Sequence, residues 1–327
     1  MLLSNGILIE LPFYRWYDRW RMVGLVVLLF AAWSSVFSFG KAMLQIAPPV
    51  FLTGARMTLA GVLILGFLLI RRKVSFRLTT KQWVSIGFLA LFSIYLTNVL
   101  EFWGLQHLSS AKTCFIYSLS PFFAALFSYL HFKEKMTLTK WVGLSIGLVG
   151  FIPVLQMQTG SEELFSLAGF LSLPALAVMG AALFSVYGWV LLRLIVKDHE
   201  ISPLVANGSS MLIGGLFALI HSFFIDSWNP LPVAEGKMGT FAWGIVSMTL
   251  LYNLVCYNAY GYMLRKYTAT FLSFMGLLSP IFATLAGWAL LGEKPSPYIF
   301  LSTAIVSIGL WLVYRSELKQ GYVKKLS

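Results

Sequence analysis

The chain has 327 residues, of which 58% are hydrophobic and only 11% are charged, and its mean hydropathy is +0.80. A soluble domain carries about a quarter charged residues, so this composition excludes an ordinary water-soluble fold. The formal net charge is +12. Because the basic residues lie in short segments between apolar runs, we expect them to contact lipid headgroups of the bilayer and not nucleic acid.

Apolar runs of about twenty residues, the length that crosses a bilayer core as a helix, recur along the whole chain. An interfacial cytoplasmic segment, 1–21, is predicted first. The first half, 22–156, has predicted helices at 22–42, 49–70, 82–103, 110–131 and 138–156. The second half, 167–314, has them at 167–193, 203–225, 239–263, 269–291 and 297–314, before a basic cytoplasmic tail at 315–327. The sequence therefore predicts an all-α integral membrane protein with ten transmembrane helices.

Lys and Arg residues lie mainly on one side of these helices. If the N-terminus is inside, 19 of the 24 fall in inner segments, namely 15–21, 71–81, 133–140, 193–197, 265–266 and 315–325. Three fall outside, namely Lys112, Lys237 and Lys294. By the positive-inside rule, we expect both termini in the cytoplasm and the chain in the inner (plasma) membrane of a cell.

The two halves share residues at a fixed offset. At 159 residues, Ser120-Pro121 falls on Ser279-Pro280, and Glu134-Lys135 falls on Glu293-Lys294. At 154 residues, three more positions match, namely Pro49, Met57 and Gly61 with Pro203, Met211 and Gly215. Because each half has an odd number of predicted helices, the second half enters the membrane from the opposite side. Inverted repeats of this kind are typical of secondary transporters.

The repeated strings resemble a known family. SPFFAALFSYLHFKEKMTLTKWVGLSIGLVGF at 120–151 and SPIFATLAGWALLGEKPSPYIFLSTAIVSIGLWLV at 279–313 are similar to the EamA-type repeat of the drug/metabolite transporter superfamily. The first copy departs from the pattern with Lys133, where the second has Gly292, and Ser34 follows Trp33 where the family usually has glycine. The resemblance implies a ten-helix metabolite transporter with a central cavity between helices 1–4 and 6–9.

Two basic residues, Lys41 and Arg56, lie inside predicted helices. A charge at a helix centre in lipid costs on the order of 3 kcal/mol, so its presence indicates a candidate site. Either side chain could grip a substrate carboxylate or phosphate. The alternative is that Lys41 reaches the outer interface and that Arg56 is satisfied within the protein.

Glu101, three residues after Asn98, is the most prominent intramembrane acid. It is a candidate counter-charge for a substrate ammonium, or a proton-coupling carboxylate. The alternative is an ion pair with Lys112 or Arg56 that holds helices together. Asn98 is included with Glu101 as a candidate substrate-binding residue.

A polar and aromatic stripe runs along the eighth predicted helix, and its candidate binding residues are Tyr252, Asn253, Tyr257 and Tyr260. Trp33 and Tyr117 are candidates from the first half, and weaker ones are Phe37, Tyr187, Trp189 and Asn207. These side chains could stack on a planar or cationic group. The alternative is hydrogen bonding between helices.

Two further features have structural interpretations. Glu134 and Glu293 each precede a predicted helix, where a carboxylate can satisfy backbone amides. Gly143, Gly147 and Gly150 suit close helix contact, which leaves open a homodimer joined through this helix.

Together these residues predict secondary transport, by uniport, exchange or proton coupling, of a small polar or zwitterionic metabolite through alternating access. A carboxylate opposite Arg56, an ammonium opposite Glu101 and aromatic contacts would fit an amino acid or an S-adenosylmethionine-like compound. No catalytic residues and no cofactor are expected. The histidines are scattered without metal-ligand spacing, so no metal is expected, and the lack of a Gly-rich phosphate-binding loop argues against ATP hydrolysis. The alternatives are an intramembrane enzyme and a non-transporting membrane subunit.

Overall fold

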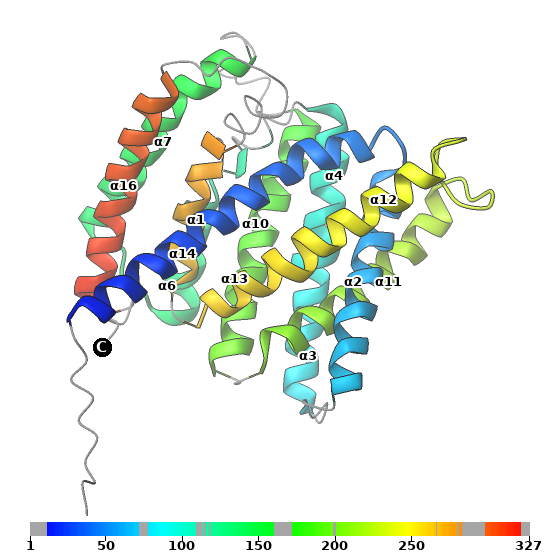
Figure 1. The fold of residues 1–327 in the computed structure, drawn as a ribbon, viewed down its shortest axis with the longest axis horizontal. Coiled ribbons are helices and arrows are strands. Elements are labelled where there is room, and N and C mark those ends of the chain that lie inside the picture. Colours follow the sequence, from blue (N-terminus) through cyan, green and yellow to red (C-terminus); the bar gives the residue numbers. More distant parts are fainter. Residues whose placement is uncertain are drawn as a thin grey trace, which may run out of the picture.

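The structure is a computed structural model. It describes residues 12–71, 78–108, 113, 116–117, 119–159, 172–198, 201–265, 267–279, 281–282 and 298–321, with side chains except at 12–23, 148, 151–159, 298–300 and 302–303. Every regular element in this part of the chain is a helix (Figure 1). The all-α prediction is therefore confirmed.

Six of the described helices are long and apolar enough to cross a membrane. Three belong to the first half, namely α1 (Pro12–Met43), α2 (Pro49–Arg71), and α3 (Thr80–Leu89) continued through the π-helical turn η1 (Ala90–Leu96) into α4 (Thr97–His107). Three belong to the second half, namely α10 (Leu173–Arg193), α11 (Pro203–Ile225), and α12 (Met238–Met248) continued through η3 (Thr249–Cys256) into α13 (Tyr257–Met263). They overlap predicted helices 1, 2, 3, 6, 7 and 8.

The remaining predicted helices correspond to other elements. These are α6 (Ser120–Phe132), α7 (Leu138–Thr159), α14 (Ala269–Met275) with the turn η4 (Gly276–Leu278), and α16 (Tyr298–Gln320). The count of ten membrane helices and the division into two five-helix units stay predictions. Two ends differ from expectation. α1 begins at Pro12 instead of 22. α16 continues past 314, because Ser316 and Glu317 are buried against neighbouring helices.

Helices from the two halves pack against each other at glycines. A Cβ atom added to Gly61 of α2 would lie 2.5 Å from the backbone nitrogen of Leu212 in α11. One added to Gly215 of α11 would lie 2.4 Å from the nitrogen of Thr58 in α2. Because Gly61 and Gly215 match at an offset of 154 residues, this contact is reciprocal between the halves. Only glycine permits so close an approach of the two backbones.

α7 and α16 meet in the same way, and they lie side by side in Figure 1. A Cβ on Gly143 would lie 2.8 Å from the carbonyl oxygen of Gly309, and one on Gly150 would lie 2.6 Å from the side chain of Ile305. The glycines that suited a contact between protomers thus pack within the chain. A homodimer stays a prediction.

Local sequence explains several helix ends. Pro49 and Pro203 are the first residues of α2 and α11, where proline's missing amide hydrogen is not needed. Thr79 and Gln82 form a capping box at the start of α3. Lys133 ends α6 with a φ of 55°, a left-handed conformation that favours glycine. The matching position of the second half is Gly292.

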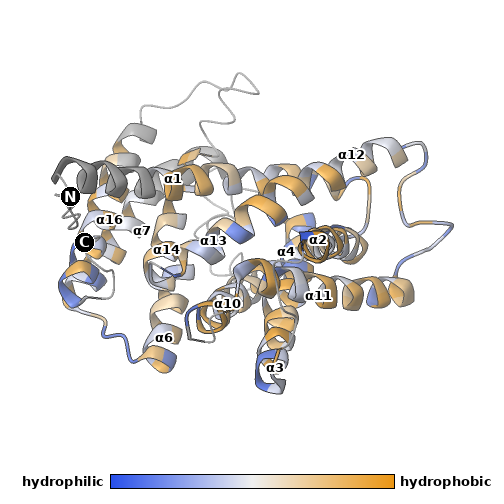
Figure 2. Ribbon diagram, turned by 60° about the horizontal axis from the view of Figure 1, so that its bottom comes forward, coloured by the Kyte–Doolittle hydropathy of each residue, from blue (hydrophilic) through white to orange (hydrophobic). Residues whose placement is uncertain are grey.

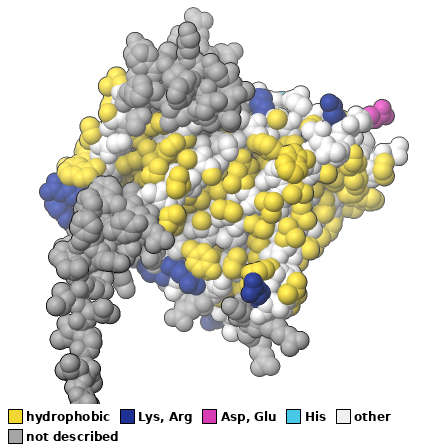
Figure 3. Space-filling model, in the orientation of Figure 1, with side chains coloured by type: hydrophobic (Ala, Val, Ile, Leu, Met, Phe, Trp, Pro, Cys, Tyr) yellow, Lys and Arg dark blue, Asp and Glu magenta, His cyan; other side chains and the backbone are white. Residues whose placement is uncertain are grey.

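The outer surface is apolar. Large side chains such as Ile70, Phe224 and Trp243 are 83%, 79% and 73% exposed. Helices are hydrophobic along most of their length, with hydrophilic residues near their ends (Figure 2), and Lys and Arg lie mainly at the edges of the face in Figure 3. Exposed apolar surface of this extent needs lipid, not water, as its solvent. The chain is a multi-pass membrane protein.

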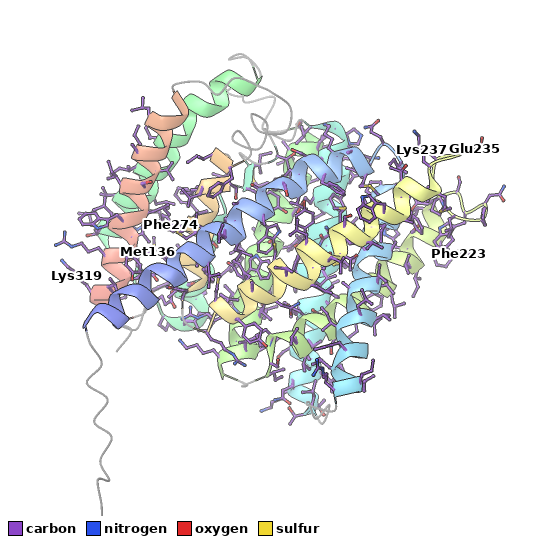
Figure 4. All side chains as sticks on the ribbon, viewed as in Figure 1. Met136, Phe223, Glu235, Lys237, Phe274 and Lys319 are labelled. Carbon is purple, nitrogen blue, oxygen red and sulfur yellow. The ribbon has the colours of Figure 1, made fainter. Side chains whose placement is uncertain are left out.

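Two ion pairs join the halves at one end of the molecule. Lys140 Nζ of α7 lies 2.9 Å from Glu317 Oε1 of α16, and the two side chains are 1% and 0% exposed. Glu134 pairs with Arg193 of α10. Lys319, close to Glu317 in sequence, lies at the opposite end of the molecule from Glu235 and Lys237 (Figure 4).

The capping role predicted for Glu134 is wrong. Its carboxylate turns to the guanidinium of Arg193, which also packs over the Phe132 ring at 4.3 Å from the centroid. The start of α7 is capped by Thr137, whose hydroxyl accepts from the amide of Lys140 at 3.3 Å. Its acidic counterpart Glu293 lies outside the described residues.

Candidate substrate-binding site

A cavity lies between the two halves and encloses about 930 Å³ of empty space, counted out to its opening. Its walls come from the first half through α1, α2, α4 and α6, and from the second half through α10, η3, α13, α14 and η4. The cavity therefore lies where a substrate can contact both repeats.

Arg56 enters the cavity from α2, two turns after Pro49. It is 2% exposed. Its Nη2 donates to Oδ1 of Asn98 on α4, and its guanidinium lies 5.0 Å from the centroid of the Phe102 ring. Its Nε has no hydrogen-bond partner. The cation is thus held by a neutral oxygen and a ring, and its charge is available to an anionic group.

Glu101 faces the same cavity from α4 and is 9% exposed. The hydroxyl of Tyr117 donates to its Oε2 at 2.5 Å. Within the described part of the chain, ion pairs at 4 Å or less are Lys140–Glu317 and Glu134–Arg193, so Arg56 and Glu101 do not pair with each other. The alternative partner Lys112 lies outside the described residues. Opposite charges that share a cavity without pairing can bind the two ends of a zwitterion.

Four aromatic side chains from three helices pack together beside these charges. Trp33 of α1 lies 5.5 Å from Trp189 of α10 and 5.3 Å from Tyr257 of α13, measured between ring centroids. Trp189 lies 4.3 Å from Tyr260. All four line the cavity. Such a wall offers ring faces for a planar or cationic group.

Eight of the ten predicted binding residues line this one cavity, namely Trp33, Arg56, Asn98, Glu101, Tyr117, Tyr252, Tyr257 and Tyr260. Lys41 and Asn253 are not in its lining. Lys41 donates to the backbone carbonyl oxygens of Leu105 and Leu108 at the end of α4. This contact satisfies a helix C-terminus, where a cation is favourable.

Asn253 is turned away by the π-helical turn. The expected stripe assumed a regular helix, in which Asn253 and Tyr257 share a face four residues apart. In η3 the amide of Tyr257 bonds to the carbonyl of Tyr252, five residues back, so that these two tyrosines face the cavity together. The Asn253 amide instead lies 3.0 Å from the sulfur of Met57.

Several lining residues were weak candidates or absent from the prediction. Trp189 and Phe37, both weak candidates, line the cavity, whereas Tyr187 and Asn207 do not. Small hydroxyl residues were missed, namely Thr97, Ser120, Ser185, Ser273 and Ser279. Ser120 and Ser279 are the serines of the repeated Ser-Pro motif. Their shared offset was a usable signal, because a residue kept in both halves of an inverted repeat can face the same central space.

The described residues contain no group of three or more His, Cys, Asp or Glu side chains that could hold a metal ion. The cavity instead offers one cation, one carboxylate, hydroxyl groups and aromatic faces.

The family model for the EamA-like transporter family matches residues 20–156 and again 172–315. The chain belongs to the EamA-like transporter family. As a member, it is a metabolite transporter and not an enzyme, and the family expectation drawn from the repeated strings is confirmed.

Named relatives of this EamA-like transporter include two from Chlamydia. A protein of Chlamydia muridarum is 40% identical over 318 residues, covering 97% of this chain and 99% of its own, and is named S-adenosylmethionine/S-adenosylhomocysteine transporter. One of Chlamydia trachomatis serovar L2 bears the same name and is 42% identical, covering 89% of this chain and 88% of its own. The uncharacterized inner membrane transporter YedA of Escherichia coli is 26% identical, covering 89% and 90%.

A solved crystal structure has the same overall fold as this EamA-like chain. Its TM-score is 0.71 at 18% sequence identity, and the match covers 91% of this chain and 97% of the other. At that identity the similarity concerns the fold alone.

Proposed function

We propose that the cavity binds a zwitterionic metabolite of the S-adenosylmethionine and S-adenosylhomocysteine class. The proposal depends on one observation, which is that Arg56 and Glu101 share a buried cavity without pairing to each other. An amino-acid headgroup carries a carboxylate for Arg56 and an ammonium for Glu101. Two buried charges that were only structural would be expected to neutralise each other directly.

The rest of such a molecule fits the aromatic wall. An adenine ring can stack on Trp or Tyr faces, and a sulfonium is a cation that aromatic rings attract. Trp33, Trp189, Tyr257 and Tyr260 supply these faces next to the charges. The names of the Chlamydia relatives support this substrate class for the present chain.

We further propose that transport is secondary and uses alternating access between inverted halves, with both termini in the cytoplasm. Residues from both halves line the cavity, which is what a site exposed to each side in turn requires. In that orientation the pairs Lys140–Glu317 and Glu134–Arg193 lie on the cytoplasmic side. They would hold the halves together there and would have to separate when the cavity opens inward.

Exchange in proteoliposomes tests the substrate and the site. Vesicles loaded with unlabelled S-adenosylmethionine or S-adenosylhomocysteine should take up labelled S-adenosylmethionine faster than vesicles without protein. Arg56→Met should lower this uptake by at least about tenfold, because it removes a charged hydrogen-bond donor. Arg71→Met, at the exposed end of the same helix, is the matched control and should leave uptake unchanged.

Wild-type uptake equal to that of empty vesicles would refute the substrate class. If the wild-type protein takes up substrate and Arg56→Met takes it up equally fast, the assignment of Arg56 to the binding site would be refuted, whereas the substrate class would still stand.

A further inference from the structure

The two halves contain the same unusual helical feature at matching positions. The π-helical turns η1 (Ala90–Leu96) and η3 (Thr249–Cys256) each interrupt a membrane-spanning helix. After η1, the amide of Thr97 bonds to the carbonyl of Phe92, and after η3 the amide of Tyr257 bonds to that of Tyr252. π-helical turns are rare and often lie at functional sites. Because the π-helical turn is present in both halves, its two copies can be compared residue by residue.

An asparagine follows each turn, and Asn258 lies 160 residues after Asn98. Nδ2 of Asn98 donates to the carbonyl oxygens of Ser93 at 3.2 Å and Ile94 at 2.8 Å. Nδ2 of Asn258 donates to those of Asn253 at 3.2 Å and Leu254 at 2.9 Å. Each side-chain amide is therefore anchored on its own π-helical turn, and its oxygen must point away from that turn.

The two asparagines differ in what this oxygen holds. Oδ1 of Asn98 accepts from the guanidinium of Arg56, inside the cavity. Oδ1 of Asn258 accepts from Nδ2 of Asn207 at 3.1 Å, and neither of these two residues lines the cavity. An asparagine anchored on a π-helical turn thus orients the Arg56 cation in the cavity of the first half. In the second half it orients the neutral amide of Asn207, which is buried away from the cavity.

We infer that Asn98 is a positioning residue that aims Arg56 at the carboxylate of the substrate. This inference rests on the proposed function. Asn98 fixes Nη2 of the guanidinium, while the Phe102 ring lies 5.0 Å from its central carbon. Because the amide oxygen carries no charge, Arg56 keeps its full positive charge for the ligand. An aspartate at this position would neutralise Arg56 from within and repel an incoming carboxylate.

The test compares two ligands that differ in the carboxylate alone, S-adenosylmethionine and decarboxylated S-adenosylmethionine. Binding to the purified full-length protein is measured for both by calorimetry. Asn98→Asp should weaken S-adenosylmethionine binding by about 10- to 100-fold, because the aspartate pairs with Arg56 in place of the ligand carboxylate, which then loses its hydrogen bond to a charged group. Binding of the decarboxylated ligand should stay within a few-fold of wild type. The preference between the ligands should therefore fall or reverse.

Asn258→Asp is the matched control, because it removes the same amide contacts from the other π-helical turn without facing the ligand. Both ligands should bind it as they bind wild type. If Asn98→Asp does not fold, Asn98→Ala replaces it and should show the same selective loss, because Arg56 is then charged but no longer held.

Equal weakening of both ligands by the Asn98 variants, or no weakening, would overturn the positioning role while leaving the proposed function intact. A wild-type protein that binds neither ligand would overturn the proposed function, and the inference with it.

Discussion

Removing Lys140 tests whether the buried charges at the joined ends of the halves are held by each other. Lys140→Met leaves Glu317, which is 0% exposed, without its ion-pair partner, whereas the hydroxyl of Thr268 still donates to its Oε2 at 2.6 Å. Breaking one partner of a buried ion pair costs about 3–5 kcal/mol. At roughly 2 °C per kcal/mol for a chain of this size, the melting temperature in detergent should fall on the order of 6–10 °C.

The loss should depend on pH with a defined sign. Glu317 lies beyond the predicted span 297–314. Burial raises the pKa of its carboxyl, which Lys140 and Thr268 counteract. Since the folded-state pKa is the higher one, stability is present at low pH and is lost as the pH rises above about 4.3, the ordinary carboxyl value. Without Lys140 the shift grows, so the deficit of Lys140→Met should be large at pH 8 and smaller at pH 5.5.

The assay is thermal unfolding followed by tryptophan fluorescence, with Lys319→Met, at an exposed lysine of α16, as the matched control. The double variant Lys140→Met/Glu317→Met should recover most of the loss, because two apolar side chains can replace a buried pair at little cost. A single variant that melts at the same temperature as wild type, or a double variant no more stable than the single one, would show that Lys140 and Glu317 do not stabilise each other.

Two further variants test packing and the site. Gly61→Ala should destabilise the protein by about 1–3 kcal/mol, because its Cβ would lie 2.5 Å from the backbone of Leu212. The control Gly66→Ala lies on the same helix with nothing within 4 Å of its Cβ and should leave stability unchanged. Equal melting temperatures of the two variants would contradict the helix contact. Tyr117→Phe should weaken substrate binding by about tenfold, because it removes the hydrogen bond to Glu101. The control Tyr129→Phe, at an exposed tyrosine, should leave the affinity unchanged. Unchanged affinity in Tyr117→Phe would show that its hydroxyl does not contribute to substrate binding.

The helices that cross the membrane were predictable because lipid leaves few ways to satisfy a backbone. The span 203–225 is α11 to the residue, and 49–70 is one residue short of α2. The predicted and observed helices differ mainly at their ends, because the predicted spans were ended at charged residues. The helix through Ser316 and Glu317 continues because those side chains are buried against other helices, which hydropathy does not record.

The charged part of the candidate site was predictable for a related reason. A charged side chain inside a membrane helix is costly and indicates a site, which singled out Lys41, Arg56 and Glu101. Of these three, Arg56 and Glu101 line the cavity and Lys41 does not. The position of Asn253 was not predictable, because a π-helical turn adds a residue to the helical period without any marker in composition. The role of Asn98 depends on the equivalent turn of the first half, η1, and it emerges only when Arg56 and the carbonyls of Ser93 and Ile94 are seen together.

Alternating access requires that the cavity can be reached from each side of the membrane, and cysteine labelling measures this. Ser120, which lines the cavity, is replaced by cysteine in a chain whose native Cys114 and Cys256 are alanine, and vesicles of both orientations are treated with an impermeant maleimide. Alternating access predicts labelling from either side, with S-adenosylmethionine changing the rate. Labelling confined to one side, with and without S-adenosylmethionine, would contradict a central cavity that opens to both sides in turn.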